Sequence, residues 1–265
     1  MPHGGLVDAN MEAAGASGRY RADVPPSSSN GLRVRAAAPF PDVATGVDSV
    51  RPNLRDEHSG MTTGVDEVDA ARGREYALLS LLLARAPDRF LLYRLAELRG
   101  DASPLGAAHA ALAESAARTS AERVEREYFA LFVGLGRGEL LPYGSYYLSG
   151  FLHERPLARL RAHLARLGIE RAKGESEPED HAAILCEVMA GLANGELPAA
   201  GADRELFEQH LSPWIGRFFA DLERAGAADF YRPVATLGRV FIDIETAAFA
   251  LATDTGNTSD RKQCP

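Results

Sequence analysis

The sequence lacks the features that mark secreted and membrane-spanning proteins. Only two cysteines occur in 265 residues, Cys186 inside an apolar helical pattern and Cys264 near the end. Cysteines so few and so placed do not form a disulfide framework, and they favour a reducing compartment. No run of about eighteen apolar residues could span a membrane, and the first residues lack the basic patch and apolar core of a secretory signal. We therefore expect a soluble, cytoplasmic protein without a membrane span.

Positive charge and catalytic motifs are also scarce. The formal net charge is -8 at pH 7, which argues against nucleic acid as a partner because phosphate backbones select basic surfaces. The same charge suits a partner that is itself basic. The sequence contains no serine elbow, no HExxH and no cysteine cluster, and its seven histidines are scattered. We expect no catalytic residues, no metal site and no bound cofactor.

The two ends of the chain are predicted to lie outside the folded domain. Residues 1–67 are rich in Gly, Ala, Ser, Pro and Asp and show no helical or strand period. Such a segment cannot bury enough apolar surface to offset its ordering entropy, so we expect a disordered extension. It is interpreted as an extension without a role, with a tethering or targeting tail as the alternative. Residues 253–265 are expected to form a flexible tail.

Between these ends the patterns are helical. Apolar residues recur at helical spacing, and Pro87, Gly168 and Gly226 interrupt them. No alternating segment is long enough for a convincing strand, so residues 68–252 are predicted to form a single compact all-α domain. Further helix starts are predicted at Pro104, Thr119, Pro156, Ser176, Asp203, Ser212 and Asp229. Ser176 and Glu179 have capping-box spacing, which places Asp180 and His181 in the first turns of a helix.

The most unusual stretch is YFALFVGLGRGELLPYGSYYLSG, from Tyr128 to Gly150. A helix ends there in three closely spaced glycines, and a proline and three tyrosines follow: Gly134, Gly136, Gly138, Pro142, Tyr143, Tyr146 and Tyr147. Connections between helices are ordinarily polar and variable. A connection this rich in aromatic rings is either packed against the body of the protein or offered to a partner.

Two motifs invite a catalytic interpretation, and the residues alone do not support it. The spacing of Gly134, Gly136 and Gly138 is not that of a nucleotide-binding loop, so a turn with positive backbone angles is favoured. Asp180 next to His181 is reminiscent of an acid-base pair. Neighbours on a helix point about 100° apart, however, and no nucleophile accompanies them. By pattern alone they are a helix-start charge and a surface histidine.

Taken together, several motifs resemble the TorD/DmsD family of chaperones, which help to mature exported molybdenum-containing oxidoreductases. The matching segments are Tyr128 with Leu131–Gly134, Pro142–Leu148, Leu167–Gly168, Glu177–His181, His210–Trp214 and Phe230–Tyr231. The resemblance covers residues 74–251 and does not reach the first seventy residues. It departs from the family at Tyr143, where the family's loop can carry tryptophan.

The resemblance implies an all-helical chaperone without catalytic activity that binds the twin-arginine signal peptide of a client enzyme and delays export until the cofactor is inserted. The client would be a molybdopterin oxidoreductase of the formate dehydrogenase or sulfoxide/amine-oxide reductase type, and the chaperone a monomer or an exchange dimer. Carried over residue by residue, the signal-peptide site consists of Tyr128, Leu131, Phe132, Pro142, Tyr143, Ser145, Tyr146, Asp180 and His181.

The chemistry of a signal peptide agrees with this site. Its basic start and apolar stretch require an apolar groove with acidic groups near one end. The aromatic loop supplies the first, and the candidates for the second are Glu139, Glu177, Glu179 and Asp180. We therefore expect Asp180 and His181 to be functional. The alternative is a nucleotide (GTP)-dependent switch or enzyme that uses the glycine loop with Asp180 and His181.

Overall fold

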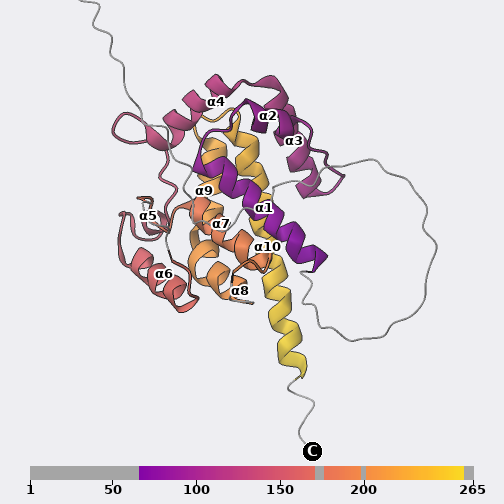
Figure 1. The fold of residues 1–265 in the computed structure, drawn as a ribbon, viewed down its shortest axis with the longest axis vertical. Coiled ribbons are helices and arrows are strands. Elements are labelled where there is room, and N and C mark those ends of the chain that lie inside the picture. The colour runs from indigo at the N-terminus through magenta and orange to yellow at the C-terminus, as the bar shows by residue number, and fades with distance from the viewer. Residues whose placement is uncertain (1–65, 171–175, 198–200, 260–265) are drawn as a thin grey trace, which may run out of the picture.

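The computed structural model describes residues 66–170, 176–197 and 201–259, and for residues 252–259 the backbone alone (Figure 1). Most of the predicted extension, residues 1–65, and the end of the predicted tail, residues 260–265, lie outside this range. The helices are α1 Glu67–Ala84, α2 Arg89–Ala96, α3 Pro104–Arg118, α4 Ala121–Tyr128, η1 Phe129–Val133, α5 Gly144–Ser149, α6 Arg155–Arg166, α7 Ala182–Ala193, α8 Asp203–Leu206, η2 Phe207–Leu211, α9 Ser212–Arg224 and α10 Tyr231–Ser259. No strand occurs among the described residues, which confirms the predicted all-α fold.

Helix α7 lies at the centre because its sequence is apolar on nearly every side. Eleven of its residues, from Ala182 to Ala193, are buried, as expected for a helix surrounded by others. Helix α1 packs along it, and α10 packs against α9 and α3. Figure 1 shows the C-terminal part of α10 projecting beyond the other helices. None of the described helices combines the length and hydropathy needed to cross a bilayer.

Local sequence signals fix several helix ends. Asp88 accepts hydrogen bonds from the first amides of α2, and Ser103 caps α3 directly before Pro104. Pro156 lies in the first turn of α6, and Gly168 follows that helix with a φ of 69°. These are the ends that side-chain capping, first-turn proline and left-handed glycine predict.

The predicted capping box at Thr119 is wrong by one residue. Ser120 is the N-cap of α4, and its hydroxyl accepts a hydrogen bond from the Arg123 amide at 3.4 Å. Thr119 is instead the C-cap of α3. Both residues carry a hydroxyl that can cap a helix, so the sequence does not distinguish them. The choice follows from where α3 ends.

The predicted helix start near Ser176 is also wrong. Helix α7 begins at Ala182, with His181 as its N-cap, so Asp180 precedes the helix. The predicted start at Ser212 is confirmed, because α9 begins there, directly after α8 and η2. At the chain's end, α10 continues to Ser259, past the predicted domain boundary at Ala252.

Two carboxylates fasten the turn that precedes α10. Glu127 on α4 accepts hydrogen bonds from the amides of Asp229, Phe230 and Tyr231 at 2.7–3.0 Å. Glu139 accepts from the amides of Gly226 and Ala227 at 2.7 and 3.1 Å. Amides at a helix start have no partner within the helix, and a carboxylate near them is favoured by the helix dipole. The segment around the glycine turn is thereby tied to the start of α10.

Replacement of Glu127 by Ala should lower the free energy of unfolding by about 1–3 kcal/mol, because several backbone donors lose a charged acceptor. Urea denaturation followed by circular dichroism measures this change. Glu125→Ala is the matched control, since Glu125 is exposed on the same helix, and it should change stability by less than about 0.5 kcal/mol. Equal losses in the two variants would contradict the capping role.

Candidate functional site

The aromatic stretch, Tyr128–Gly150, and the EPEDH segment, Glu177–His181, meet in the structure. The Gly144 amide donates to the Asp180 carbonyl at 2.9 Å, and the Ala182 amide donates to the Pro142 carbonyl at 2.8 Å. Tyr143 and His181 therefore face each other as an isolated antiparallel bridge. Their rings lie edge to face with centroids 5.1 Å apart. This backbone pairing is the reason that α7 cannot begin before Ala182.

Asp180 holds the start of α5. Its side chain is 3% exposed, and its Oδ2 accepts a hydrogen bond from the Ser145 amide at 2.7 Å. Tyr143, the N-cap residue of α5, makes no side-chain capping bond. Asp180 thus supplies from a distant segment the acceptor that an N-cap side chain ordinarily provides. Its Oδ1 is buried without a hydrogen-bond partner, and Asp180 also lines a hollow of about 20 Å³ beside His210.

His181 caps the next helix. Its Nδ1 accepts a hydrogen bond from the Ala183 amide at 3.1 Å, and the side chain is 7% exposed. Burial lowers the pKa of His181, which keeps Nδ1 free of a proton and able to accept. Asp180 and His181 therefore serve two different helix starts and do not form an acid-base pair.

Tyr143 lies beside Glu177, whose charge also acts on Tyr128. The Tyr143 hydroxyl donates to Glu177 Oε1 at 2.6 Å, and the pKa of Tyr143 is raised by its burial and by this carboxylate. Burial and the charge of Glu177 raise the pKa of Tyr128 to about 12. The Tyr128 hydroxyl donates to the Ala84 carbonyl at 3.0 Å. Both tyrosines are part-exposed, so their side chains lie at the border between the interior and the surface.

The nine predicted site residues divide by burial. The buried ones are Leu131, Pro142, Ser145, Asp180 and His181. The part-exposed ones are Tyr128, Phe132, Tyr143 and Tyr146. The Ser145 hydroxyl is buried without a hydrogen-bond partner, and Gly144 packs so closely that a Cβ there would meet Trp214 Nε1 at 3.0 Å. The structure joins Pro142, Tyr143, Ser145, Asp180 and His181 through direct contacts, and of the nine predicted residues only the part-exposed ones present side chains at the surface.

Several exposed apolar residues in or next to the aromatic stretch were not among the predicted site residues. They are Phe129, Val133, Leu135, Leu148, Phe151 and Leu152. Leu135 is 97% exposed at the tip of the glycine turn, and Phe151 is 69% exposed after α5. Helical periodicity assigns such residues to a core by default. The sequence signal that could have predicted the exposure of Leu135 is its position between Gly134 and Gly136.

The glycine segment forms a turn, as predicted. Gly134 and Gly136 have φ values of 63° and 92°. The Gly134 amide donates to the Phe129 carbonyl at 2.7 Å, and the amides of Glu139 and Leu140 donate back to Ala130 and Leu131. These donors are used within the chain and are not gathered into a phosphate cradle.

Two histidines join α6 to η2 next to the small hollow. His163 Nδ1 and His210 Nε2 are 2.9 Å apart, and His163 is 1% exposed. Burial lowers the pKa of His163. Burial, together with His163 and the nearby Arg159 and Arg166, lowers the pKa of His210 to about 4. The pair is therefore uncharged in the folded protein near neutral pH.

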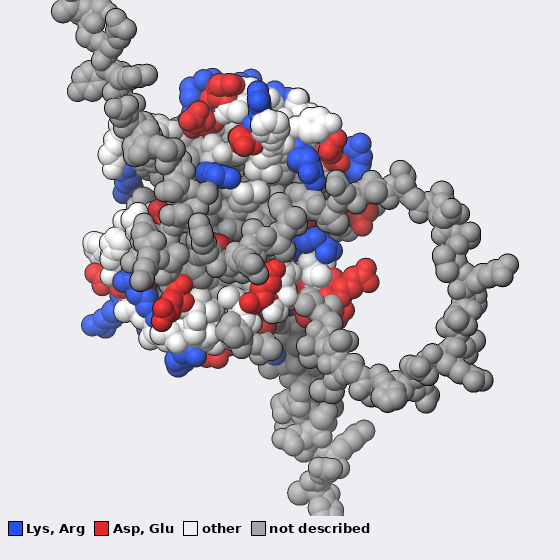
Figure 2. Space-filling model, viewed as in Figure 1, with Lys and Arg blue, Asp and Glu red and all other residues white. Residues whose placement is uncertain are grey.

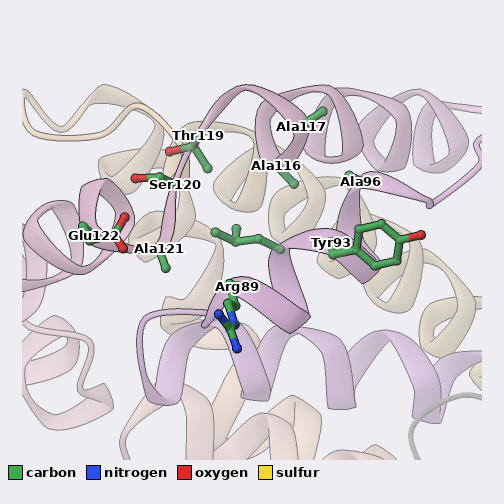
Figure 3. Close-up of a pocket in the computed structure, with 10 residues that line it drawn as sticks. Arg89, Tyr93, Ala96, Ala116, Ala117, Thr119, Ser120, Ala121 and Glu122 are labelled. Carbon is green, nitrogen blue, oxygen red and sulfur yellow. The ribbon is translucent and has the colours of Figure 1, made fainter.

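A larger hollow lies elsewhere, between α2, the end of α3 and the start of α4. Its volume is about 510 Å³ (Figure 3). Figure 3 shows Ala96, Ala116 and Ala117 along its wall and Tyr93 extending at its edge. No group of three or more His, Cys, Asp or Glu side chains suited to a metal occurs among the described residues.

The comparisons with known proteins agree with the motifs in the middle of the chain. Residues 98–220 match the family model described as nitrate reductase delta subunit, and this range includes the aromatic stretch and the EPEDH segment. The chaperone protein TorD of Vibrio cholerae serotype O1 is 31% identical over 122 residues, which cover 42% of this chain and 56% of the relative. The chain is similar to the TorD chaperones. The TorD protein of Pasteurella multocida is 30% identical over 112 residues, with the same shares covered.

These matches confirm the resemblance to TorD chaperones. The chain spans 56% of the length of these relatives, little more than half. A crystal structure from Archaeoglobus fulgidus, of a protein provisionally described as a redox enzyme maturation protein, aligns with 73% of this chain and 99% of its own. Its identity is 22% and its TM-score 0.44, a similarity too low to carry an argument.

Removal of the Asp180 carboxylate should loosen α5. Asp180→Ala is expected to lower the free energy of unfolding by about 1–2 kcal/mol, the usual effect of losing an N-cap acceptor. Asp180→Asn keeps one acceptor oxygen and should lose less. Urea denaturation of the two variants and the wild type measures the difference. An unchanged free energy of unfolding in Asp180→Ala would contradict the capping role.

The histidine pair should make stability fall in mild acid. Between pH 6.5 and about 4, these histidines bind protons more readily in the unfolded chain than in the folded protein. The free energy of unfolding therefore decreases as the pH falls below about 6.5. We expect the Tm to drop between pH 7 and pH 5, and to drop less in His210→Gln. Thermal melts across this range test the difference, and equal drops in both proteins would contradict it.

Proposed function

We propose that this protein is a cytoplasmic chaperone that binds the twin-arginine signal peptide, and the apo body, of an exported molybdopterin oxidoreductase and delays export until the cofactor is inserted. The client would be of the formate dehydrogenase or sulfoxide/amine-oxide reductase type. The named relatives are chaperones, not enzymes, and binding alone requires no covalent chemistry. The observation that carries the proposal is the set of exposed apolar side chains between Phe129 and Leu152, in the stretch that pairs with His181 through Tyr143.

That surface is concentrated in one part of the chain. Most of the large apolar side chains exposed in the described residues fall between Phe129 and Leu152. Figure 1 shows the turn after α4 and the α5 region on the same side of the molecule. Contiguous exposed apolar surface marks interaction sites in soluble proteins. Acidic and basic side chains are interspersed across the face in Figure 2, so we assign the main binding energy to apolar contacts.

The proposed site works in two layers. The part-exposed side chains of Tyr128, Phe132, Tyr143 and Tyr146 contact the peptide directly, together with the exposed apolar residues. Arg137 holds Tyr146 in place through a hydrogen bond of 2.9 Å between its guanidinium and the tyrosine hydroxyl. The buried predicted residues, with Asp180 and His181 among them, support this surface from behind. Asp180 acts on the ligand through α5, because its carboxylate is directed inward.

A synthetic twin-arginine signal peptide with an apolar stretch tests this proposal. The wild-type chain should bind it, and the double variant Leu135→Ser, Phe151→Ser should bind at least about ten-fold more weakly, because each side chain loses apolar contact area. Fluorescence anisotropy measures both affinities. Both positions are highly exposed, so the substitutions leave the core unchanged.

Phe90→Ser is the matched control. Phe90 is 67% exposed on α2, close to the 69% of Phe151, and its loss should leave peptide affinity unchanged. Equal weakening in control and double variant would argue against the apolar surface as the binding site. Calorimetric titration with GTP addresses the alternative, and magnesium-dependent binding with turnover would favour a nucleotide-dependent switch.

A further inference from the structure

One face of α10 is apolar although it is exposed. The side chains that share this face are half-buried or exposed, and they are Val240, Ile244, Ala247, Ala248 and Leu251. At about 100° per residue these positions fall within one arc of about 100°, so they form a continuous stripe along the helix. We call it the α10 stripe. The solvent face of a helix is ordinarily charged or polar, so this stripe requires an explanation.

The inner face of the same helix turns is already occupied. Glu245 is 1% exposed, and its carboxylate accepts hydrogen bonds from Arg72 at 2.8 and 2.9 Å. The Phe249 ring packs against Phe207 with centroids 5.1 Å apart, and the Phe249 carbonyl accepts a hydrogen bond from Arg204 at 2.8 Å. These contacts fix α10 to the body of the protein and set its rotation. The α10 stripe is therefore held in the exposed position.

The α10 stripe becomes more exposed toward the C-terminal end of the helix. Val240 is half-buried, Ile244 is 44% exposed and Leu251 is 69% exposed. Exposure rises in the direction in which α10 leaves the other helices, and Figure 1 shows that end projecting beyond them. A partner can therefore reach the stripe without displacing another helix.

The order of side chains in the α10 stripe is symmetric about its centre. A large residue, two alanines and a large residue follow one another from Ile244 to Leu251. A two-fold axis that passes between Ala247 and Ala248, perpendicular to the helix, places Ile244 of one copy opposite Leu251 of the other. The alanines at the crossing point let the two helix axes approach closely. This self-complementarity is what an interface between identical chains requires.

An antiparallel crossing suits both the helix dipoles and the shape of the chain. Antiparallel helices bring the positive end of each dipole near the negative end of the other. The projecting parts of α10 then overlap, and the two bodies lie at opposite ends of the helix pair. A parallel crossing would instead bring both bodies to the same end.

We propose that the α10 stripe is a dimer interface, across which α10 of a second copy of this chain packs in the antiparallel direction. No element is exchanged between the two copies. Stable interfaces take about 20–30 residues from each partner, and the stripe offers fewer. The dimer is therefore weak, with a Kd of about 10–100 µM.

This dimer leaves the proposed peptide surface free. Only the start of α10 lies against the aromatic stretch, where the rings of Tyr231 and Phe132 have centroids 5.4 Å apart. The crossing point at Ala247 and Ala248 follows about 25 Å further along the helix, at 1.5 Å per residue. Each copy in the dimer therefore keeps an accessible aromatic stretch.

Sedimentation velocity of the full-length protein, from about 1 µM to about 500 µM, tests the association. The weight-average mass should rise from the 28.4 kDa of one chain toward twice that value. Leu251→Glu should weaken the dimer at least about ten-fold, because the interface would bury charged side chains among apolar ones. Phe90→Glu is the matched control. Phe90 is 67% exposed on α2, close to the 69% of Leu251, and its replacement should leave the association unchanged.

Disulfide cross-linking tests the direction of the helix pair. The background is the full chain with Cys264→Ser, in which the remaining native cysteine, Cys186, is buried. Ile244→Cys combined with Leu251→Cys should give a covalent dimer under mild oxidation, because the two positions face each other. Leu251→Cys alone should not, since its two copies lie about 10 Å apart along the helices and a disulfide requires Cα atoms within about 7 Å. Circular dichroism verifies that each variant is folded.

Four results would overturn the proposal. The first is a wild type that stays monomeric up to about 500 µM. The second is equal weakening by Leu251→Glu and Phe90→Glu. The third is efficient cross-linking of Leu251→Cys alone, which identifies a parallel pair. The fourth is a monomeric chain in which the thiol of Leu251→Cys reacts slowly with maleimide, because residues 1–65 would then be the occupant of the stripe.

Discussion

The pairing of Pro142–Gly144 with Asp180–Ala182 is the constraint on which the site depends. Two backbone hydrogen bonds align the segments, and the Asp180 carboxylate then reaches the Ser145 amide at the start of α5. Short helices are marginal without support from packing or caps, and α5 has only six residues. The position of α5, and of the tyrosines on it, is therefore set by a residue from another part of the chain. The EPEDH segment acts as a scaffold before any ligand arrives.

In this arrangement, the residues that support the proposed binding surface differ from those that would contact a partner. Buried polar groups position the surface, while the exposed side chains, from Leu135 at the glycine turn to Phe151 after α5, offer apolar area to a partner. The glycines serve this division, because positive φ angles at Gly134 and Gly136 allow Leu135 to stand out from the turn. Arg137 and Arg217 stiffen the same surface by lying over Tyr146 and Tyr147. A preorganised surface loses less entropy on binding than a flexible one.

The sequence predicted the fold class and the helix ends that depend on neighbouring residues. It missed the helix start and the side-chain burial that depend on distant residues. The all-α fold and the helix ends at Pro104, Pro156 and Gly168 follow from periodicity and local capping signals. The start of α7 does not, because the bonds that delay it come from Pro142 and Gly144, about forty residues earlier. Burial of Asp180 and exposure of Leu135 were missed for the same reason: a local pattern does not show which segment covers a side chain. The residues of the proposed site were named through family resemblance, and the proposed division into contacting and supporting residues required the structure.

Hydrogen–deuterium exchange with and without a twin-arginine signal peptide tests the central claim most directly. The account predicts that the amides of Gly144, Ser145 and Ala182 exchange slowly in the free protein and change little on binding, since they are already hydrogen-bonded within the scaffold. New protection should appear at the glycine turn, residues 134–138, and in residues 148–152 after α5. Rapid exchange of the scaffold amides before binding, or protection confined to the α2 face, would contradict a preformed peptide site at this position.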